Sequence, residues 1–119
     1  MRADIKSEED ITLLVHSFYD KLLLDEFMAV HFHGLDLKHH FPRIIDFWSL
    51  ILLDKMGYTS NVFDKHIHLN INQQHFDRWV QLFSKTVDEL FEGEKANFAK
   101  QRAAVLGYTF GSKMDSLHR

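Results

Sequence analysis

A chain of 119 residues, 45% of them hydrophobic, is long enough to bury a core of its own, so we expect one domain spanning residues 1–119. The net charge of -3 arises from interspersed acids and bases, which argues against nucleic-acid binding, and no apolar run is long enough to span a membrane. The chain has no cysteine, which excludes disulfides and thiolate metal sites, and no signal peptide is apparent, so we predict a cytoplasmic protein.

Aromatic residues are more frequent than packing alone requires in so short a chain, with eleven Phe, two Trp and three Tyr. A pocket lined with rings and a core that is simply rich in Phe are two uses for them. Either use requires elements that bring the rings together.

The first predicted element is a helix. Its apolar residues recur at the spacing of one helical face, namely Ile11, Leu14, Val15, Phe18 and Leu22. Ser7 and Asp10 stand ahead of this face as a variant of the capping box, and Tyr19 lies on its flank. The next segment, residues 26–37, is short and mixed, and it predicts a helical turn followed by a connection.

A second long helix is predicted within HHFPRIIDFWSLILLDKMG, residues 39–57. Its apolar positions are Ile44, Ile45, Phe47, Trp48, Ile51 and Leu52. Proline is tolerated in a first helical turn, where its missing N–H has no intrahelical acceptor, but it disrupts an interior. Because of Pro42 we expect this helix to start near residues 38–42, with His40 in its opening turn, and to end at Gly57.

The second half of the chain also has a helical pattern. Turn-forming residues at 57–63 lead into a short helical piece at about 62–69, and Asn70 or Asn72 can cap a long helix. The apolar face of that helix comprises Phe76, Trp79, Val80, Phe83, Val87 and Leu90. After Gly93 a last helix carries Ala96, Ala99, Ala103, Leu106 and Phe110 on one face. No segment alternates as a strand does, so the predicted fold class is all-α.

The nine histidines raise the question of a metal site. Three close pairs occur, His31/His33, His39/His40 and His66/His68. None of them combines the i, i+3 or i, i+4 spacing with carboxylates, as a zinc or di-iron site on helices would, and the chain has no His-Glu-x-x-His motif. Surface positions are the simplest interpretation for most histidines, and we assign them to His16, His75 and His118.

His66 differs from the others because it lies between apolar residues, in a short segment after a turn-rich loop. A neutral imidazole beside an apolar cavity lined with Phe and Trp can hold a haem iron axially. His68 competes for this role, but two residues two positions apart on a helix point about 200° apart, so only one of them can face the pocket.

The order of residues along the chain resembles that of group III truncated haemoglobins. The residues that carry the resemblance are Phe18, Tyr19, Phe32, His40, Phe47, Trp48, His66 and Trp79. The resemblance extends from about residue 7 to residue 113, and the Gly-Gly turns typical of groups I and II are absent. It implies a truncated globin-like fold, a two-over-two helical sandwich that encloses a haem pocket.

The resemblance also implies roles for individual residues. His66 matches the proximal ligand of the iron in haem b, iron protoporphyrin IX. The distal side chains that stabilise a bound ligand match Tyr19, His40 and Trp79. Further cofactor-binding positions, apolar ones around the porphyrin and basic ones for its propionates, are Phe32, Arg43, Ile44, Trp48 and Lys65.

The distal histidine is where the chain departs from the family pattern. The connection between Phe32 and His40 is short, and Pro42 follows His40 by two residues. Both features place His40 at the edge of its helix, from which it can swing outward. His39 takes its place if the register shifts by one residue.

The implied activity follows from the distal donors. Two or three donors to a bound dioxygen slow its escape, since each charge-assisted bond contributes on the order of 1.5–3 kcal/mol. Slow release disfavours oxygen transport and favours detoxification of nitric oxide or peroxide. No nucleotide-binding motif is present, so a catalytic use needs a separate reductase. The expected partners are therefore dioxygen, nitric oxide or other small diatomic ligands, with no nucleic acid and no membrane.

Two alternatives stay open at the level of sequence. In the first, the protein is a haem-based ligand sensor or a partner-regulating module, in which ligand binding moves His40 or the segment around His66. In the second, it is a helical domain without haem, and its aromatic core binds nothing.

Overall fold

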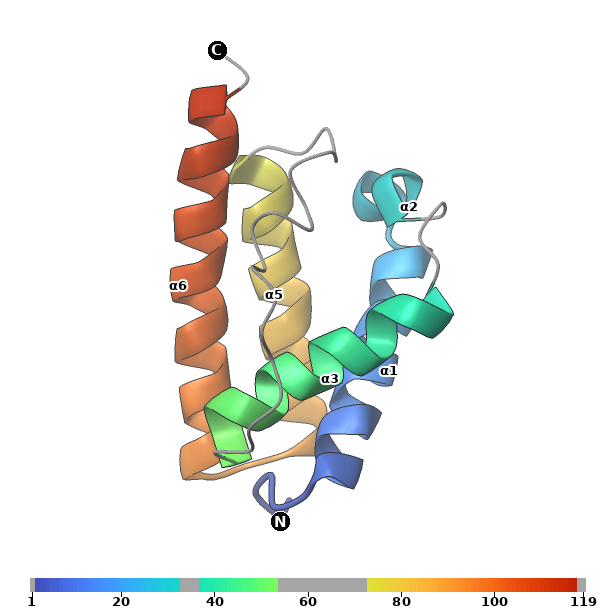
Figure 1. Ribbon diagram of the computed structural model, residues 1–119, viewed down its shortest axis with the longest axis vertical. Helices are drawn as coiled ribbons and strands as arrows, with labels where there is room; N and C mark the ends of the chain where they lie inside the picture. The colour runs from blue at the N-terminus through green and yellow to red at the C-terminus, as the bar shows by residue number, and fades with distance from the viewer. Residues whose placement is uncertain (1, 33–36, 54–72, 118–119) are drawn as a thin grey trace.

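The computed structural model describes residues 2–32, 37–53 and 73–117, and within these ranges every regular element is a helix. The helices are α1 (Glu8–Leu24), α2 (Glu26–Phe32), α3 (Leu37–Leu53), α5 (Gln73–Leu90) and α6 (Glu94–Leu117). Figure 1 shows α5 and α6 side by side and antiparallel, with α3 crossing α1 and α5. The α1 and α3 pair therefore packs on the α5 and α6 pair. The predicted all-α, two-over-two fold is confirmed.

Helix α1 begins as its sequence predicts. The Ser7 Oγ accepts a hydrogen bond from the backbone N–H of Asp10 at 3.3 Å, and the Asp10 carboxylate accepts one from the N–H of Ser7 at 3.3 Å. This capping box satisfies two N–H groups that the first turn of a helix leaves without intrahelical partners. The apolar face that follows is buried, and Tyr19 is buried with it.

Helix α3 begins at Leu37, one residue before the expected range, and places His40 in its first turn as predicted. Pro42 stands inside the helix, beyond the first turn, so the expectation that it marks that turn is wrong. Its ring leaves the carbonyl of Lys38 without an i+4 N–H donor. The end expected at Gly57 lies outside the described residues.

The turn between α5 and α6 is built around a glycine and a carboxylate from the other end of the chain. Gly93 has a φ of +145°, a backbone conformation that residues with a side chain rarely adopt. The Asp4 carboxylate accepts hydrogen bonds from the backbone N–H groups of Lys95 at 3.0 Å and Ala96 at 2.9 Å. Asp4 therefore caps α6 from a distance. A Cβ on Gly93 would lie 2.5 Å from the Asp4 Cγ, so glycine is required twice over.

Small residues bring α6 against α5. Ala96, Ala99 and Ala103 are all buried, as the apolar pattern of the last helix predicts. One turn further along, a Cβ on Gly107 would lie 2.5 Å from the Val80 Cγ2, so the two helices approach closely at this point. Within the described residues, no helix is both long enough and apolar enough to cross a membrane.

Candidate functional site

Tyr19 is the polar group most deeply set among the predicted site residues. It lies on the buried face of α1 and is 3% exposed. Its hydroxyl forms a hydrogen bond with the Nε2 of His40, at 2.5 Å. Burial raises the pKa of Tyr19 far above its ordinary value, because a phenolate would be poorly solvated there. Tyr19 thus keeps its proton at physiological pH and can serve as a donor.

His40 reaches Tyr19 from the first turn of α3. The two rings meet edge to face, with centroids 5.4 Å apart and an angle of 81° between their planes. A protonated phenol can donate to the Nε2 of a neutral imidazole or accept from Nε2–H, so the tautomer of His40 sets the direction of this bond. His40, which the sequence placed where it could swing outward, is turned toward Tyr19 in this structure.

Trp79 joins the same cluster through Phe18. The Phe18 ring lies edge to face against both Tyr19, at 5.5 Å, and Trp79, at 5.6 Å between centroids. Trp79 is half-buried on α5 and also stacks on Phe83, at 5.7 Å. Residues from three helices therefore surround one aromatic region, with Tyr19 and His40 as its polar members.

Trp48 also stacks on Phe83. The centroids of these two rings lie 4.8 Å apart and their planes form an angle of 17°, so Phe83 contacts both tryptophans. Trp48 is 2% exposed and belongs to the core. Of the two other predicted residues on α3, Ile44 is half-buried and packs against the core, whereas Arg43 is exposed.

Three predicted positions have no described side chain. Phe32 is the last residue of α2, and only its backbone is described. Lys65 and His66 lie outside the described residues, as does the competing His68. The side chain of His39, the alternative to His40, is likewise not among those described.

Helix α2, which carries Phe32, and Asp25 just before it both contact α5. Arg78 donates to the Asp25 Oδ2 from Nε at 2.8 Å and from Nη2 at 2.6 Å. Burial alone would raise the pKa of Asp25, but these bonds and the backbone N–H groups of Met28 and Phe27 lower it overall. The Phe27 ring stacks on His75 with centroids 4.3 Å apart.

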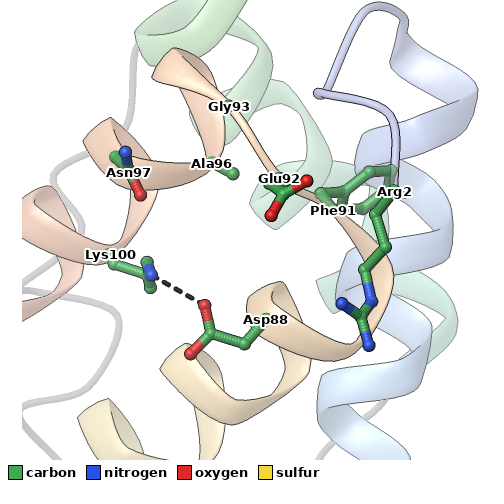
Figure 2. Close-up of a pocket in the computed structure, with 8 residues that line it drawn as sticks. All are labelled: Arg2, Asp88, Phe91, Glu92, Gly93, Ala96, Asn97 and Lys100. Atoms are coloured by element: carbon green, nitrogen blue, oxygen red, sulfur yellow. Dashed lines mark hydrogen bonds and ion pairs between the residues drawn. The ribbon is translucent and has the colours of Figure 1, made fainter.

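A groove of about 470 Å³ lies elsewhere, between the end of α5, the start of α6 and the N-terminal segment. Its lining residues, drawn in Figure 2, are Arg2, Asp88, Phe91, Glu92, Gly93, Ala96, Asn97 and Lys100. Asp88 and Lys100 point toward each other across it and form an ion pair at 2.7 Å. None of the predicted site residues whose side chains are described lines this groove, so the aromatic cluster is the stronger candidate.

The sequence reasoning assigned Phe18, Phe83 and Phe41 no role in the site. Phe18 and Phe83 were placed on the correct helix faces, but their contact with each other, edge to face at 5.2 Å, depends on how α1 crosses α5. Phe41 was not singled out, although it lies next to His40 and packs against Tyr19, with centroids 5.1 Å apart. The position of Phe41 directly after a candidate histidine is the sequence feature that could have identified it.

The cluster places polar groups in an apolar setting. A buried phenol and an imidazole at hydrogen-bonding distance lie among packed aromatic rings. Hydrogen bonds in such surroundings are stronger than in water.

Comparisons with known proteins cover nearly the same span. A family model described as bacterial-like globin matches residues 4–106. A group 3 truncated hemoglobin from Campylobacter jejuni is 26% identical over 117 residues, 92% of each chain. A crystal structure of a group III truncated hemoglobin from Campylobacter jejuni matches with a TM-score of 0.84 and 26% identity, over 96% of this chain and 95% of that one. A group 1 truncated hemoglobin from Tetrahymena pyriformis is 29% identical over 84 residues, 70% of this chain and 69% of its own.

Proposed function

Because the chain belongs to the bacterial-like globin family, which implies haem-based ligand binding, we propose that it uses haem b to bind dioxygen, nitric oxide and related diatomic molecules. Its use is the detoxification of nitric oxide or peroxide rather than oxygen transport. Residues 1–119 act as a single haem-binding domain, located in the cytoplasm.

His66 would hold the haem by binding its iron. Phe32, Ile44 and Trp48 form the apolar surroundings of the porphyrin, and Arg43 and Lys65 pair with its propionates. The exposed position of Arg43 and the packing of Ile44 against the core support these two assignments. The haem supplies an iron atom at which a diatomic ligand binds and can be reduced.

The observation that carries the proposal is the hydrogen bond between Tyr19 and His40 within an aromatic cluster. Tyr19 keeps its proton and donates it to the ligand as a hydrogen bond, and His40 and the Trp79 indole N–H are the further donors. Two such bonds, at about 1.5–3 kcal/mol each, slow ligand release by a factor of about 10² or more. A protein that holds oxygen this long is a poor carrier.

The same donors favour reaction over release. They draw electron density toward the outer oxygen atom, which weakens the bond between the two oxygens. For nitric oxide the overall change is NO plus O₂ plus one electron to nitrate, and the electron comes from a separate reductase. A histidine ligand gives less electronic push than a thiolate, so strong oxygen insertion is disfavoured.

One observation favours the ligand sensor as a second candidate function. The Tyr19 hydroxyl already has a partner in His40, so where Tyr19 donates this bond, a ligand that accepts from the same hydroxyl must displace or share it. Ligand binding would then change the position of the first turn of α3. A ligand-dependent protein partner would support this alternative over an enzyme.

Absorption spectra test the proposal. The purified protein is reconstituted with haem and compared, ferric and then reduced under carbon monoxide, with His66→Ala and the matched control His68→Ala. We expect a histidine-ligated spectrum for the wild type and for His68→Ala, and its loss only in His66→Ala. Absence of a Soret band in the wild type, or a spectrum that survives the loss of His66, would contradict the proposal. Nitrate formation from nitric oxide, oxygen and a reductant then tests the detoxification step.

A further inference from the structure

Phe41 occupies an unusual place beside the Tyr19 and His40 pair. It follows His40 in α3, and its half-buried ring packs against α1. The ring centroid lies 4.4 Å from that of His16 and 5.1 Å from that of Tyr19. His16 and Tyr19 are three residues apart, so they are neighbours on one face of α1. Phe41 therefore contacts two adjacent residues of that face.

Tyr19 is consequently held by two consecutive residues of α3. His40 contacts it through the hydroxyl and through an edge-to-face ring contact, and Phe41 contacts the ring at a different angle, 67° between planes. Consecutive side chains on a helix point about 100° apart. Two contacts from such directions to one ring fix both the rotation and the distance of the first turn of α3 relative to α1.

The backbone of α3 lacks a hydrogen bond at this same point. Pro42 has no N–H to donate to the carbonyl of Lys38, so the turn that carries His40 lacks one of its own hydrogen bonds. Pro42 and Arg43 are both exposed, so they pack little against the rest of the molecule. Side-chain contacts to α1 must then hold this turn, and the Phe41 contacts are well placed to do so.

We propose that Phe41 is a positioning residue that holds His40 against Tyr19, with the His16 ring as its outer support. It sets how often the Tyr19 hydroxyl is engaged by His40 and how often it is free for a ligand. Its importance for ligand release rests on the proposed function, whereas its effect on the Tyr19 and His40 bond does not.

The first test needs no haem. In the full-length protein without added haem, proton NMR should show a downfield hydroxyl resonance that disappears in Tyr19→Phe and in His40→Ala. We expect Phe41→Ala to abolish this resonance and Phe41→Tyr, which retains the ring, to restore it. His16→Ala, a change at an exposed residue that should not disturb folding, should broaden it. The matched control is Phe47→Ala, another half-buried Phe of α3, which should leave it unchanged.

Three results would overturn the inference. The resonance could persist in Phe41→Ala, it could vanish equally in Phe47→Ala, which would indicate a general loosening, or the wild type could lack it altogether. Because haem is absent from this measurement, its outcome is separate from that of the haem-binding test.

The second test uses the haem-loaded protein. The oxygen dissociation rates of Phe41→Ala and His40→Ala should change in the same direction and agree within about threefold. The double variant should match His40→Ala alone, because residues that act through one contact are not additive. Additive effects would mean that Phe41 acts independently of His40, which contradicts the inference.

Discussion

At the scale of single residues, the candidate site contains a phenol, Tyr19, that burial keeps protonated. Burial raises the pKa of Tyr19, so its hydroxyl keeps its proton at pH values near neutrality. The same burial requires a partner for the hydroxyl, and His40 is that partner. A ligand that bound next to Tyr19 would meet a hydroxyl that is already held by His40.

Replacing Tyr19 with Phe removes this donor and almost no volume. We expect the oxygen dissociation rate of the haem-loaded protein to rise by about tenfold to a hundredfold, the equivalent of one hydrogen bond to a charged acceptor. Trp79→Phe should raise it in the same way through loss of the indole N–H. Stopped-flow displacement of oxygen by carbon monoxide measures both rates. The control is Tyr108→Phe at a tyrosine that is 71% exposed, and unchanged rates in both site variants would show that other groups hold the ligand.

At the scale of elements, α6 relies on residues far from it in sequence for its start and on small residues for its packing. Asp4 accepts from the N–H groups of Lys95 and Ala96, and the alanines of α6 face the core. Both features are tertiary contacts, so the intrinsic helix propensity of residues 94–117 does not account for them.

The Asp4 cap makes the stability of the protein depend on pH. Burial alone would raise the pKa of Asp4, but the N–H groups of Lys95, Ala96 and Ile5 and the charge of Lys95 lower it overall. A folded-state pKa below the unfolded value stabilises the protein above about pH 4, and this contribution is lost as pH falls through the folded-state pKa. Urea unfolding at pH 7 should show that Asp4→Ala costs about 1 kcal/mol, the usual effect of losing a cap.

The same variant should lose less stability than the wild type between pH 5 and pH 3, since it lacks the carboxylate that must be protonated. Asp20→Ala, at an exposed position of α1, is the control and should behave as the wild type. An equal loss of stability on acidification in Asp4→Ala would argue against the cap.

The small residues of α6 allow a matched pair of substitutions. Ala103 is fully buried and Ala104 is exposed, and both are in the middle of the helix. Ala103→Leu should cost about 1–3 kcal/mol because the added atoms have no room, whereas Ala104→Leu should stay within about 0.5 kcal/mol of the wild type. Urea denaturation measures both. If Ala103→Leu is as stable as Ala104→Leu, α6 does not pack as closely as described.

At the scale of the whole molecule, long-range contacts hold the corner between α1 and α2 on α5. Asp25 and Arg78 are 53 positions apart, and the Asp25 side chain is 10% exposed. The corner determines where Phe32 lies at the end of α2. Its attachment therefore holds α2 against α5 without contributing a residue to the aromatic cluster.

Arg78→Gln tests this attachment. It removes the cation and leaves the Asp25 carboxylate with only its backbone donors, so we expect a loss of about 1 kcal/mol at pH 7, given that Arg78 is partly exposed. The pKa of Asp25 should rise, which shrinks the stability lost between pH 5 and pH 3. Arg102→Gln, at an exposed position of α6, serves as the control. Thermal unfolding is followed by circular dichroism. Equal melting temperatures for Arg78→Gln and Arg102→Gln would contradict the prediction.

Periodicity was sufficient to predict the helices, because each face repeats within a few residues. The capping box at Ser7, the break at Gly93 and the alanine face of α6 are local signals of this kind, and all three are confirmed. The family resemblance is confirmed as well, and it is what brought Tyr19, His40 and Trp79 into one hypothesis.

Local sequence patterns of this kind do not predict which side chains meet between helices. The Phe41 contacts with His16 and Tyr19, and the stacking of Phe83 on both Trp48 and Trp79, depend on the angles at which helices cross. The position of Pro42 inside α3 was not predicted. The rule that proline belongs in the first turn considers one helix alone, whereas tertiary packing can offset the hydrogen bond that proline removes. The proximal side, with His66 and Lys65, stays a prediction.

The Asp4 cap also bears on the order in which the molecule folds. Its bonds to Lys95 and Ala96 join residues that are 91 and 92 positions apart, so closing this contact restricts nearly the whole chain. During synthesis, Asp4 leaves the ribosome long before its partners exist, and the α5–α6 turn cannot be completed until both have emerged. Contacts of such high sequence separation slow folding. We therefore expect α1 to form early with its local capping box and the start of α6 to be fixed late.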